Sequence, residues 1–352
     1  MLVTLAETPT RAADPPARRR PPITVRSGGL LIALGVLVLI ALLSLAVGAK
    51  AIPLGTVIHE LFHYDGSDNG VIIRSLRVPR TLIGLAVGAA LGVAGALMQG
   101  LTRNPLADPG VLGINAGAAA AIVTAIAALG LRTPGSYVWF GLVGAGIAAA
   151  AVYVLGSRGR SAATPVRLAL AGAVVTAVLG SFVSGLTLLD TTAFNDYRFW
   201  MVGSLATEPL VILTATGPFL LAGLLLAVYL ARPLNALALG DETGRALGAH
   251  LGRTRAVGML AITLLCGAAT ATVGPIAFVG LTVPHVARAI TGPDQRWVLP
   301  YSAVLAPILL LASDIAGRLV ARPGEIQVGI VTAFIGAPIF IAIARRRRMA
   351  QL

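Results

Sequence analysis

Long apolar runs, each free of charged residues, dominate the chain and are separated by short polar segments. Most of them approach the length of about 20 residues that a helix needs to cross the hydrocarbon core of a bilayer. They predict membrane-spanning helices over 29–49, 81–101, 111–131, 134–157, 168–189, 209–231, 256–283, 297–313 and 326–344. The run 256–283 is too long for one helix, and Gly274-Pro275 divides it because proline lacks an amide proton and clashes with the preceding turn. One helix ending near Val273 and another starting near Ile276 bring the expected number to ten.

The composition excludes an ordinary soluble domain. Hydrophobic residues make up 57% of the 352 residues and charged residues 12%, whereas soluble domains carry about 25% charged residues. The 41 glycines are typical of closely packed membrane helices. We therefore expect an all-α polytopic membrane protein with a flexible basic arm over 1–28, a ten-helix domain over 29–345 and a basic tail over 346–352. The first run also resembles a signal peptide, but it is longer than the usual apolar stretch, which favours a retained helix.

The arginines lie between the apolar runs instead of on one basic face, so nucleic-acid binding is not expected despite a net charge of +13. An even number of helices places both termini on one side. With both termini in the cytoplasm, 19 of the 27 basic residues fall in the arm, the inner loops and the tail, as the cytoplasmic excess of Lys and Arg requires. We expect a multi-pass protein of the cytoplasmic (inner) membrane.

Lys50 is the only lysine, and Ala51 follows it, so the chain contains no Walker A loop. Cys266 is the only cysteine, which excludes an intrachain disulfide and a cysteine metal cluster. His59-Glu60-Leu61-Phe62-His63 matches H-E-x-x-H, in which two histidines bind zinc and the glutamate acts as a base. No residue is marked as the required third ligand. We interpret this segment as a surface helix and expect no metal site; a membrane zinc protease is a remote alternative.

Several segments are unusual for a chain that faces lipid. They place proline, glycine or a polar amide at helix ends, and irregular backbone at membrane depth survives only where protein or water covers it. Transporters have such breaks beside the transport pathway. The candidate pathway residues are Asn104, Pro105, Gly113, Asn115, Gly117, Pro284 and His285. Asp314 and Arg318, four residues apart, are expected to form an ion pair near the outer end of their helix.

The polar segment between the sixth and seventh expected helices is long and patterned. Gly240-Asp241 is typical of a helix break followed by an N-cap, and leucines alternate with acidic and small residues around it. Such a short amphipathic segment is suited to docking a soluble partner. Its candidate residues are Leu239, Gly240, Asp241, Glu242, Ala246, Leu247 and Gly248.

Taken together, these segments resemble the FecCD-type permeases, the membrane subunits of ABC importers for iron-siderophores, haem and vitamin B12. The resemblance covers about residues 30 to 345, and each motif alone would be weak. Gln327 departs from it, because the family usually has proline after the glutamate, and this change would loosen the start of the tenth helix. The motifs are Arg77-Val78-Pro79-Arg80, 88–95 with Gln99, 103–113, 200–204, 237–241, 274–281, 284–288, Asp314 with Arg318, 325–332 and 336–340.

The resemblance implies the type II ABC importer permease fold and alternating access driven by partners. The partners would be a second permease subunit, identical or different, two cytoplasmic ATP-binding subunits and an extracytoplasmic substrate-binding protein. This chain itself would be no enzyme and would need no cofactor. A ferric-siderophore is the expected substrate, with vitamin B12 and haem as alternatives. A secondary transporter that works without an ATPase is a rival of another class.

The resemblance also implies roles for particular residues. Arg77, Arg80 and Arg318 match positions that receive acidic residues of the binding protein. The segment 239–248 matches the part that rests on the ATPase. The inner gate is expected at Thr164, Pro165 and Val166.

Overall fold

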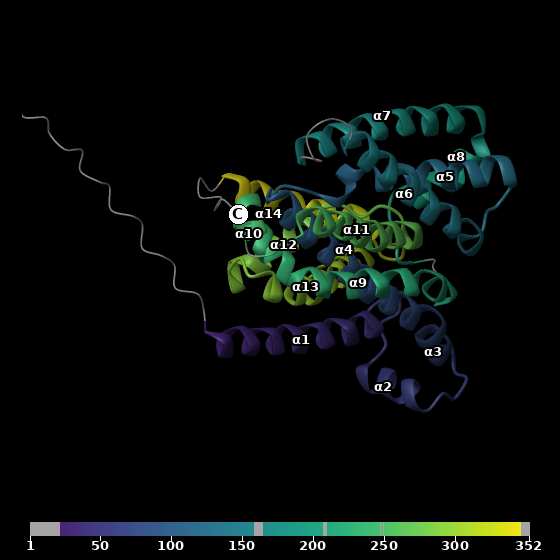
Figure 1. Ribbon diagram of the computed structural model, residues 1–352. Helices are drawn as coiled ribbons and strands as arrows, with labels where there is room; N and C mark the ends of the chain where they lie inside the picture. Colours follow the sequence, from purple (N-terminus) through teal and green to yellow (C-terminus); the bar gives the residue numbers. More distant parts are fainter. Residues whose placement is uncertain (1–21, 158–164, 207–209, 247, 249, 346–352) are drawn as a thin grey trace, which may run out of the picture.

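The computed structural model describes residues 22–345 apart from 158–164, 207–209, 247 and 249 (Figure 1). These residues form helices and connecting turns, with no strand among them. The helices are α1 (Ile23–Ala46), α2 (Leu54–Phe62), α3 (Asp68–Val71), the π-helix η1 (Ile72–Arg77), α4 (Val78–Thr102), the 3-10 helix η2 (Pro109–Leu112), α5 (Ile114–Leu129), α6 (Pro134–Ser157), α7 (Pro165–Leu189), α8 (Thr191–Met201), α9 (Leu210–Ala238), α10 (Asp241–Ala246), α11 (Leu251–Val273), α12 (Val279–Thr291), α13 (Gln295–Val320) and α14 (Val328–Arg345).

Seven helical segments in this part of the chain are long and apolar enough to cross a membrane, namely α1, the continuous stretch from α3 to α4, α6, α7, α9, α11 and α13. Helices α5 and α14 are apolar but shorter, and α12 has only 13 residues, with Pro284 inside. The run 256–283 is divided as predicted, because α11 ends at Val273. Helix α12 begins at Val279, later than expected, since Gly274 and Phe278 both have positive φ (79° and 67°).

Helices α4 and α11 form the centre of the bundle. In their apolar stretches 78% and 72% of the residues are buried, compared with 22% in α1 and 17% in α7. Glycine allows the central helices to approach closely: a Cβ on Gly92 of α4 would lie 2.5 Å from the carbonyl oxygen of Ser302 in α13. Small residues permit such backbone contact between helices in membranes. The peripheral helices expose aliphatic side chains, among them Ile32 and Val178, which is the surface that lipid tails require.

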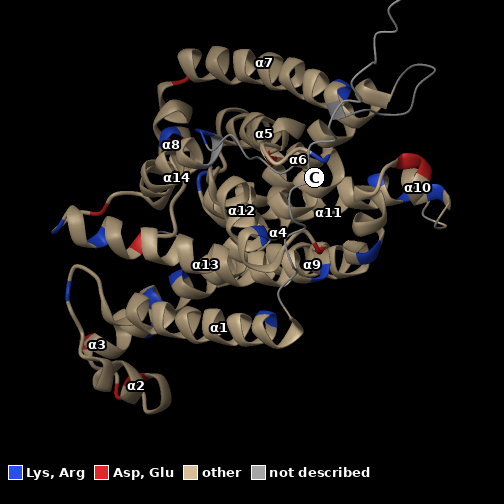
Figure 2. Ribbon diagram, turned by 90° about the vertical axis from the view of Figure 1, so that its left-hand side faces the viewer, with Lys and Arg blue, Asp and Glu red and all other residues tan. Residues whose placement is uncertain are grey.

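The two described ends of the chain lie at the same end of the bundle. The start of α1, the end of α14 and helix α10 lie there, whereas α2, α3 and α8 lie at the opposite end (Figure 1). Figure 2 shows α10 projecting from its end with acidic and basic residues side by side. We call the end that carries α10 the inner end and the opposite one the outer end. Helix α1 begins at Ile23, after Pro22, so the last residues assigned to the arm 1–28 are helical; residues 1–21 and the tail 346–352 lie outside the described residues.

Candidate functional site

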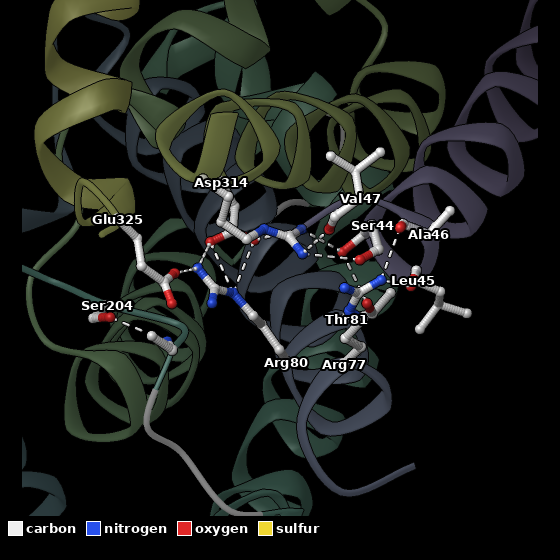
Figure 3. A network of polar contacts seen from close by, with 12 residues as sticks. Ser44, Leu45, Ala46, Val47, Arg77, Arg80, Thr81, Ser204, Asp314 and Glu325 are labelled. Carbon is white, nitrogen blue, oxygen red and sulfur yellow. Dashed lines mark hydrogen bonds and ion pairs between the residues drawn. The ribbon is translucent and has the colours of Figure 1, made fainter. Parts of the chain in front are cut away.

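A network of arginines and carboxylates joins α1, α4 and α13 at the outer end (Figure 3). Arg80 of α4 binds Asp314 of α13: its Nε lies 3.1 and 3.0 Å from the two carboxylate oxygens, and its Nη2 lies 2.6 Å from Oδ1. Arg318 binds the same carboxylate at 2.9 Å, so the expected Asp314–Arg318 pair is confirmed as part of a larger network. The Asp314 side chain is only 1% exposed, and a carboxylate buried this deeply requires the compensation that its two cations supply.

Arg77 binds the C-terminal end of α1. It is the last residue of the π-helix Ile72–Arg77, a type of turn that is frequent at functional sites. Its Nη1 donates to the carbonyl oxygens of Leu45 and Ala46 at 2.6 and 2.8 Å, and its Nη2 donates to that of Lys50. The last carbonyl groups of a helix lack partners within the helix and carry partial negative charge. Arg77 therefore satisfies and neutralises the end of α1.

Arg318 binds the same helix end from α13. Its Nη1 donates to the carbonyl oxygens of Ser44 and Val47 at 3.0 and 2.6 Å, and its Nη2 donates to Ser44 Oγ at 3.0 Å. Further along, Arg322 donates to the carbonyl oxygen of Gly48 at 2.9 Å. Three arginines, from η1, from α13 and from the turn after α13, thus hold one short stretch of backbone.

The structure brings the three expected docking arginines together but turns their guanidinium groups toward oxygen atoms of this chain. Arg77 and Arg318 are 6% and 4% exposed. Arg80 also binds Glu325 at 2.6 Å, and the Glu325 side chain is 43% exposed. Sequence reasoning assigned no role to Glu325 or to the α1 carbonyl groups. Glu325 belongs to a motif that carried the family resemblance, and this was the only signal that pointed to it.

The expected coupling segment forms α10 at the inner end. Gly240 and Gly248 flank it, both with positive φ (105° and 80°). The Asp241 carboxylate binds Arg255 of α11 at 2.8 Å and Arg103 at the end of α4. Burial alone would raise the pKa of Asp241, but the hydrogen bonds from the two guanidinium groups outweigh it and lower the pKa. This helix is therefore attached to two others through one carboxylate.

The other residues of this segment differ in exposure. Leu239, Glu242, Ala246 and Gly248 are exposed, as a surface for a partner requires. Leu247 lies outside the described residues.

The irregular segment after α4 contacts α12. Arg103 ends α4 with a left-handed backbone (φ 49°). In the turn that follows, Asn104 Oδ1 accepts a hydrogen bond from the amide of Leu106 at 2.9 Å, and the carbonyl oxygen of Pro105 lies 2.8 Å from His285 Nε2. Two candidate pathway residues are thus brought together. Pro284 lies directly before His285, inside α12.

Asn115 and Gly117 connect α5 to its neighbours. Asn115 Oδ1 accepts a hydrogen bond from Thr270 Oγ1 of α11 at 2.9 Å. Gly117 packs against Gly144 of α6, and a Cβ on either glycine would lie 2.3 Å from the carbonyl oxygen of the other. Gly113 precedes α5 with φ 69°. These residues therefore join helices to one another, and their place along a pathway stays a prediction.

The expected gate lies at the start of α7. Pro165 is the first residue of this helix, and Val166 is exposed. Thr164 lies outside the described residues.

The H-E-x-x-H segment forms α2 at the outer end. The His59 and His63 rings stack with centroids 5.4 Å apart, while Glu60 is buried and accepts a hydrogen bond from Ser67 Oγ at 3.1 Å. Arg74 donates to the carbonyl oxygen of Glu60 at 3.0 Å. Within the part of the chain that the structure describes, no group of three or more His, Cys, Asp or Glu side chains could hold a metal ion. The Glu60 side chain binds the loop that follows α2 through Ser67 and does not share a site with the histidines.

The apolar bundle, with its polar network and its charged segment at opposite ends, defines a multi-pass membrane protein of helical transporter type. Comparison with known proteins gives the family. The sequence profile of the FecCD transport family matches residues 36–346, and the chain belongs to this family.

Relatives agree with this assignment. The chain is 47% identical over 320 residues to the ferric enterobactin transport system permease protein FepD of Escherichia coli (strain K12), covering 91% of this chain and 94% of the relative. It is 43% identical over 283 residues to the probable siderophore transport system permease protein YfiZ of Bacillus subtilis (strain 168), covering 80% and 85%. The solved structure of a metal-chelate type ABC transporter in an inward-facing conformation matches with a TM-score of 0.80 and 26% identity, covering 91% and 99%.

Proposed function

We propose that this chain is the membrane permease subunit of a binding-protein-dependent ABC importer and that it carries a ferric-siderophore across the cytoplasmic membrane. The 47% identity to a ferric enterobactin permease over 91% of the chain carries this proposal. The apolar, weakly charged centre of the bundle supports it, because a passage for a substrate delivered by another protein needs few recognition groups of its own. The chain does no covalent chemistry in this scheme, and ATP hydrolysis takes place on the partner subunits.

The proposal includes ten membrane-spanning helices. The seven long apolar segments would be joined by α5, α12 and α14, which are shorter. Both described chain ends lie at the inner end, as an even number of crossings requires. The excess of basic residues in the expected inner segments supports a cytoplasmic location for that end and for both termini.

The partners follow from the same proposal. A second permease subunit, identical or different, would complete the pathway, and two ATP-binding subunits would sit below α10. The exposed residues of segment 239–248 would contact the ATPases. Asp241 would transmit the movement of the ATPases to α4 and α11 through its ion pairs with Arg103 and Arg255. The breaks around Asn104, Pro284 and Gly113 and the gate at 164–166 would move in response.

At the outer end a substrate-binding protein would deliver the substrate. The region around Arg77, Arg80 and Arg318 would attract its acidic residues, since complementary charges orient an encounter and raise its rate. Because these arginines are buried, they would act on the partner through their field or after a rearrangement of the network.

Uptake measurements test the function. Cells that lack this chain are supplied with labelled ferric enterobactin, haem or vitamin B12, with and without the chain restored. We expect the ferric-siderophore to enter only when the chain is present. If only the uptake of haem or vitamin B12 is restored, the proposed substrate is wrong, but the permease function stands. Uptake that persists when the ATP-binding subunits are removed would favour a secondary transporter.

A further inference from the structure

One arginine at the inner end of the bundle lacks a partner in the described part of the chain. Arg26 is the fourth residue of α1, which begins at the inner end (Figure 1), and only 6% of Arg26 is exposed. Its Nε is buried without a hydrogen-bond partner, and no carboxylate of the described residues forms an ion pair with it. A buried cation without an anion is costly, so this guanidinium group requires an anion from elsewhere.

The two ends of α1 differ in how their charge is balanced. At the outer end, Arg77 and Arg318 donate to the last carbonyl groups of the helix. At the inner end, the N-cap Pro22 supplies no side-chain hydrogen bond, and the first turn contains no acidic residue. The first amide groups of a helix lack partners within it and carry partial positive charge, which makes this end suitable for an anion such as phosphate.

Arg26 adds its positive charge to this end of α1. Side chains of a helix lean toward its N-terminus, so the guanidinium group is directed to the same end as the unpaired amide groups. The residue lies on the side of α1 that packs against α13, because Tyr301 Oη donates to the carbonyl oxygen of Arg26 at 2.7 Å. The anion site is therefore a buried cation beside a helix end without a cap.

An exposed apolar stripe continues from this site along α1. It starts beside Arg26 at Ser27 and follows positions three or four residues apart, which share one face of a helix. Its members Leu31, Leu34 and Val38 are 69%, 40% and 60% exposed. From Ser27 to Val38 the helix rises by about 16 Å, which is about half of the 30 Å hydrocarbon core of a bilayer. The stripe thus has the length of one leaflet.

We propose that Arg26 and the N-terminal end of α1 bind the phosphate of an anionic phospholipid in the leaflet at the inner end, with an acyl chain along Leu31, Leu34 and Val38. A lipid fits this site better than inorganic phosphate does, because the apolar stripe begins where the anion site ends. A headgroup with net negative charge is favoured over a zwitterionic one, since the site contains a cation and no carboxylate. The site goes beyond the proposed transport function and does not depend on the substrate.

Addition of lipid to the whole transporter tests the site. The purified transporter is depleted of lipid in a neutral detergent and then titrated with phosphatidylglycerol, phosphatidylcholine or inorganic phosphate. We expect phosphatidylglycerol to raise the unfolding temperature, because a ligand that binds only the folded state stabilises it. The other two should have little effect. Native mass spectrometry should find phosphatidylglycerol on this subunit, which its mass identifies.

Substitutions of Arg26 assign the effect to this residue. Arg26→Gln should need about tenfold more phosphatidylglycerol for the same stabilisation, which corresponds to one hydrogen bond to a charged group. Without anionic lipid this variant should be at least as stable as the wild type, because it removes an unpaired buried charge. Arg26→Lys should keep most of the response, since lysine also binds phosphate. Arg253→Gln is the matched control, at an exposed cation near α10, and should respond as the wild type does.

Three results would overturn the lipid site. The first is a response to phosphatidylglycerol that Arg26→Gln leaves unchanged. The second is equal stabilisation of the wild type by phosphatidylcholine or inorganic phosphate. The third is a wild type that phosphatidylglycerol does not stabilise; if Arg26→Gln is then also the less stable protein, Arg26 binds an anion within the transporter itself.

Discussion

Arg80 and Asp314, 234 residues apart in the chain, form a two-point ion pair at the outer end of the bundle. The pair connects the central helix α4 to α13, and Arg318 completes it from the next turn of α13. Because Asp314 is almost completely buried, the pair sits where an unpaired charge would be expensive. Its integrity is the first property to test.

Asp314→Asn should destabilise the protein by about 3–5 kcal/mol, because the buried Arg318 loses its carboxylate and Arg80 keeps only the more exposed Glu325. Thermal unfolding in detergent measures the loss. Asp68→Asn is the control: it removes an exposed carboxylate at the same end and should change stability by less than about 0.5 kcal/mol. Equal stability of both variants would show that the network is dispensable for folding.

Gly117→Ala should push α5 and α6 apart, because the added Cβ would lie 2.3 Å from the carbonyl oxygen of Gly144 and 2.4 Å from the Ala148 Cβ. Overpacking of this kind costs about 1–3 kcal/mol. Gly146→Ala on α6 provides the control, since no atom beyond the adjoining backbone of α6 lies within 4 Å of its added Cβ. We expect the first variant to lose stability and yield in detergent and the second to match the wild type. The reverse order would contradict the observed contact.

Asp241→Asn should separate stability from transport. The ion pairs with Arg103 and Arg255 are partly exposed, and such pairs contribute at most about 1 kcal/mol, so the unfolding temperature should hardly change. If α10 couples the ATPases to the bundle, substrate-stimulated ATP hydrolysis and uptake should fall several-fold. Normal uptake by this variant would remove Asp241 from the coupling route.

Asp294 caps the start of α13, and its charge should give a pH-dependent part of the stability. Hydrogen bonding to Arg296 lowers its pKa to about 2, although burial acts in the opposite direction, and Asn235 also donates to it. A lowered pKa stabilises the folded state above the ordinary value near 4 and loses that effect as the pH falls toward 2. Asp294→Ala should therefore cost about 1 kcal/mol at neutral pH, and the difference from wild type should shrink between pH 4 and 2. A constant difference across that range would assign the effect to packing.

His59→Ala combined with His63→Ala should leave uptake unchanged, because the histidines stack with each other while Glu60 serves the adjoining loop. Uptake of labelled ferric-siderophore measures this. A loss of uptake that added zinc restores would revive a metal site at α2.

The length of the apolar runs was enough to locate the long helices, because the length of a hydrophobic segment decides whether it can span a bilayer. The division of 256–283 was also predictable, since Gly274-Pro275 cannot continue a helix. The start of α12 was not, because Phe278 precedes it with a positive φ, which a residue other than glycine rarely adopts. The Asp314–Arg318 pair followed from helical spacing. The partner Arg80 did not, since no local rule joins residues 234 positions apart.

The orientation of the predicted docking arginines was also beyond sequence reasoning. The family resemblance supplied a role for these arginines but not the direction of their side chains. The oxygen atoms that Arg77 and Arg318 bind belong mostly to the backbone. Every residue has a backbone carbonyl group, so the sequence does not show which of these groups an arginine binds.

That dependence on carbonyl groups means that the hydrogen bonds to residues 45–48 require no particular side chain there. Arg77, Arg318 and Arg322 recognise the path of the chain there, so Leu45 and Ala46 could be exchanged for other residues without losing a hydrogen bond. Ser44 and Gly48 are the exceptions, because Ser44 Oγ accepts a hydrogen bond from Arg318 and any side chain at position 48 would meet the Arg77 guanidinium group. Among relatives, Ser44, Gly48 and the arginines that bind this stretch should therefore persist, while Leu45 and Ala46 exchange for other apolar residues.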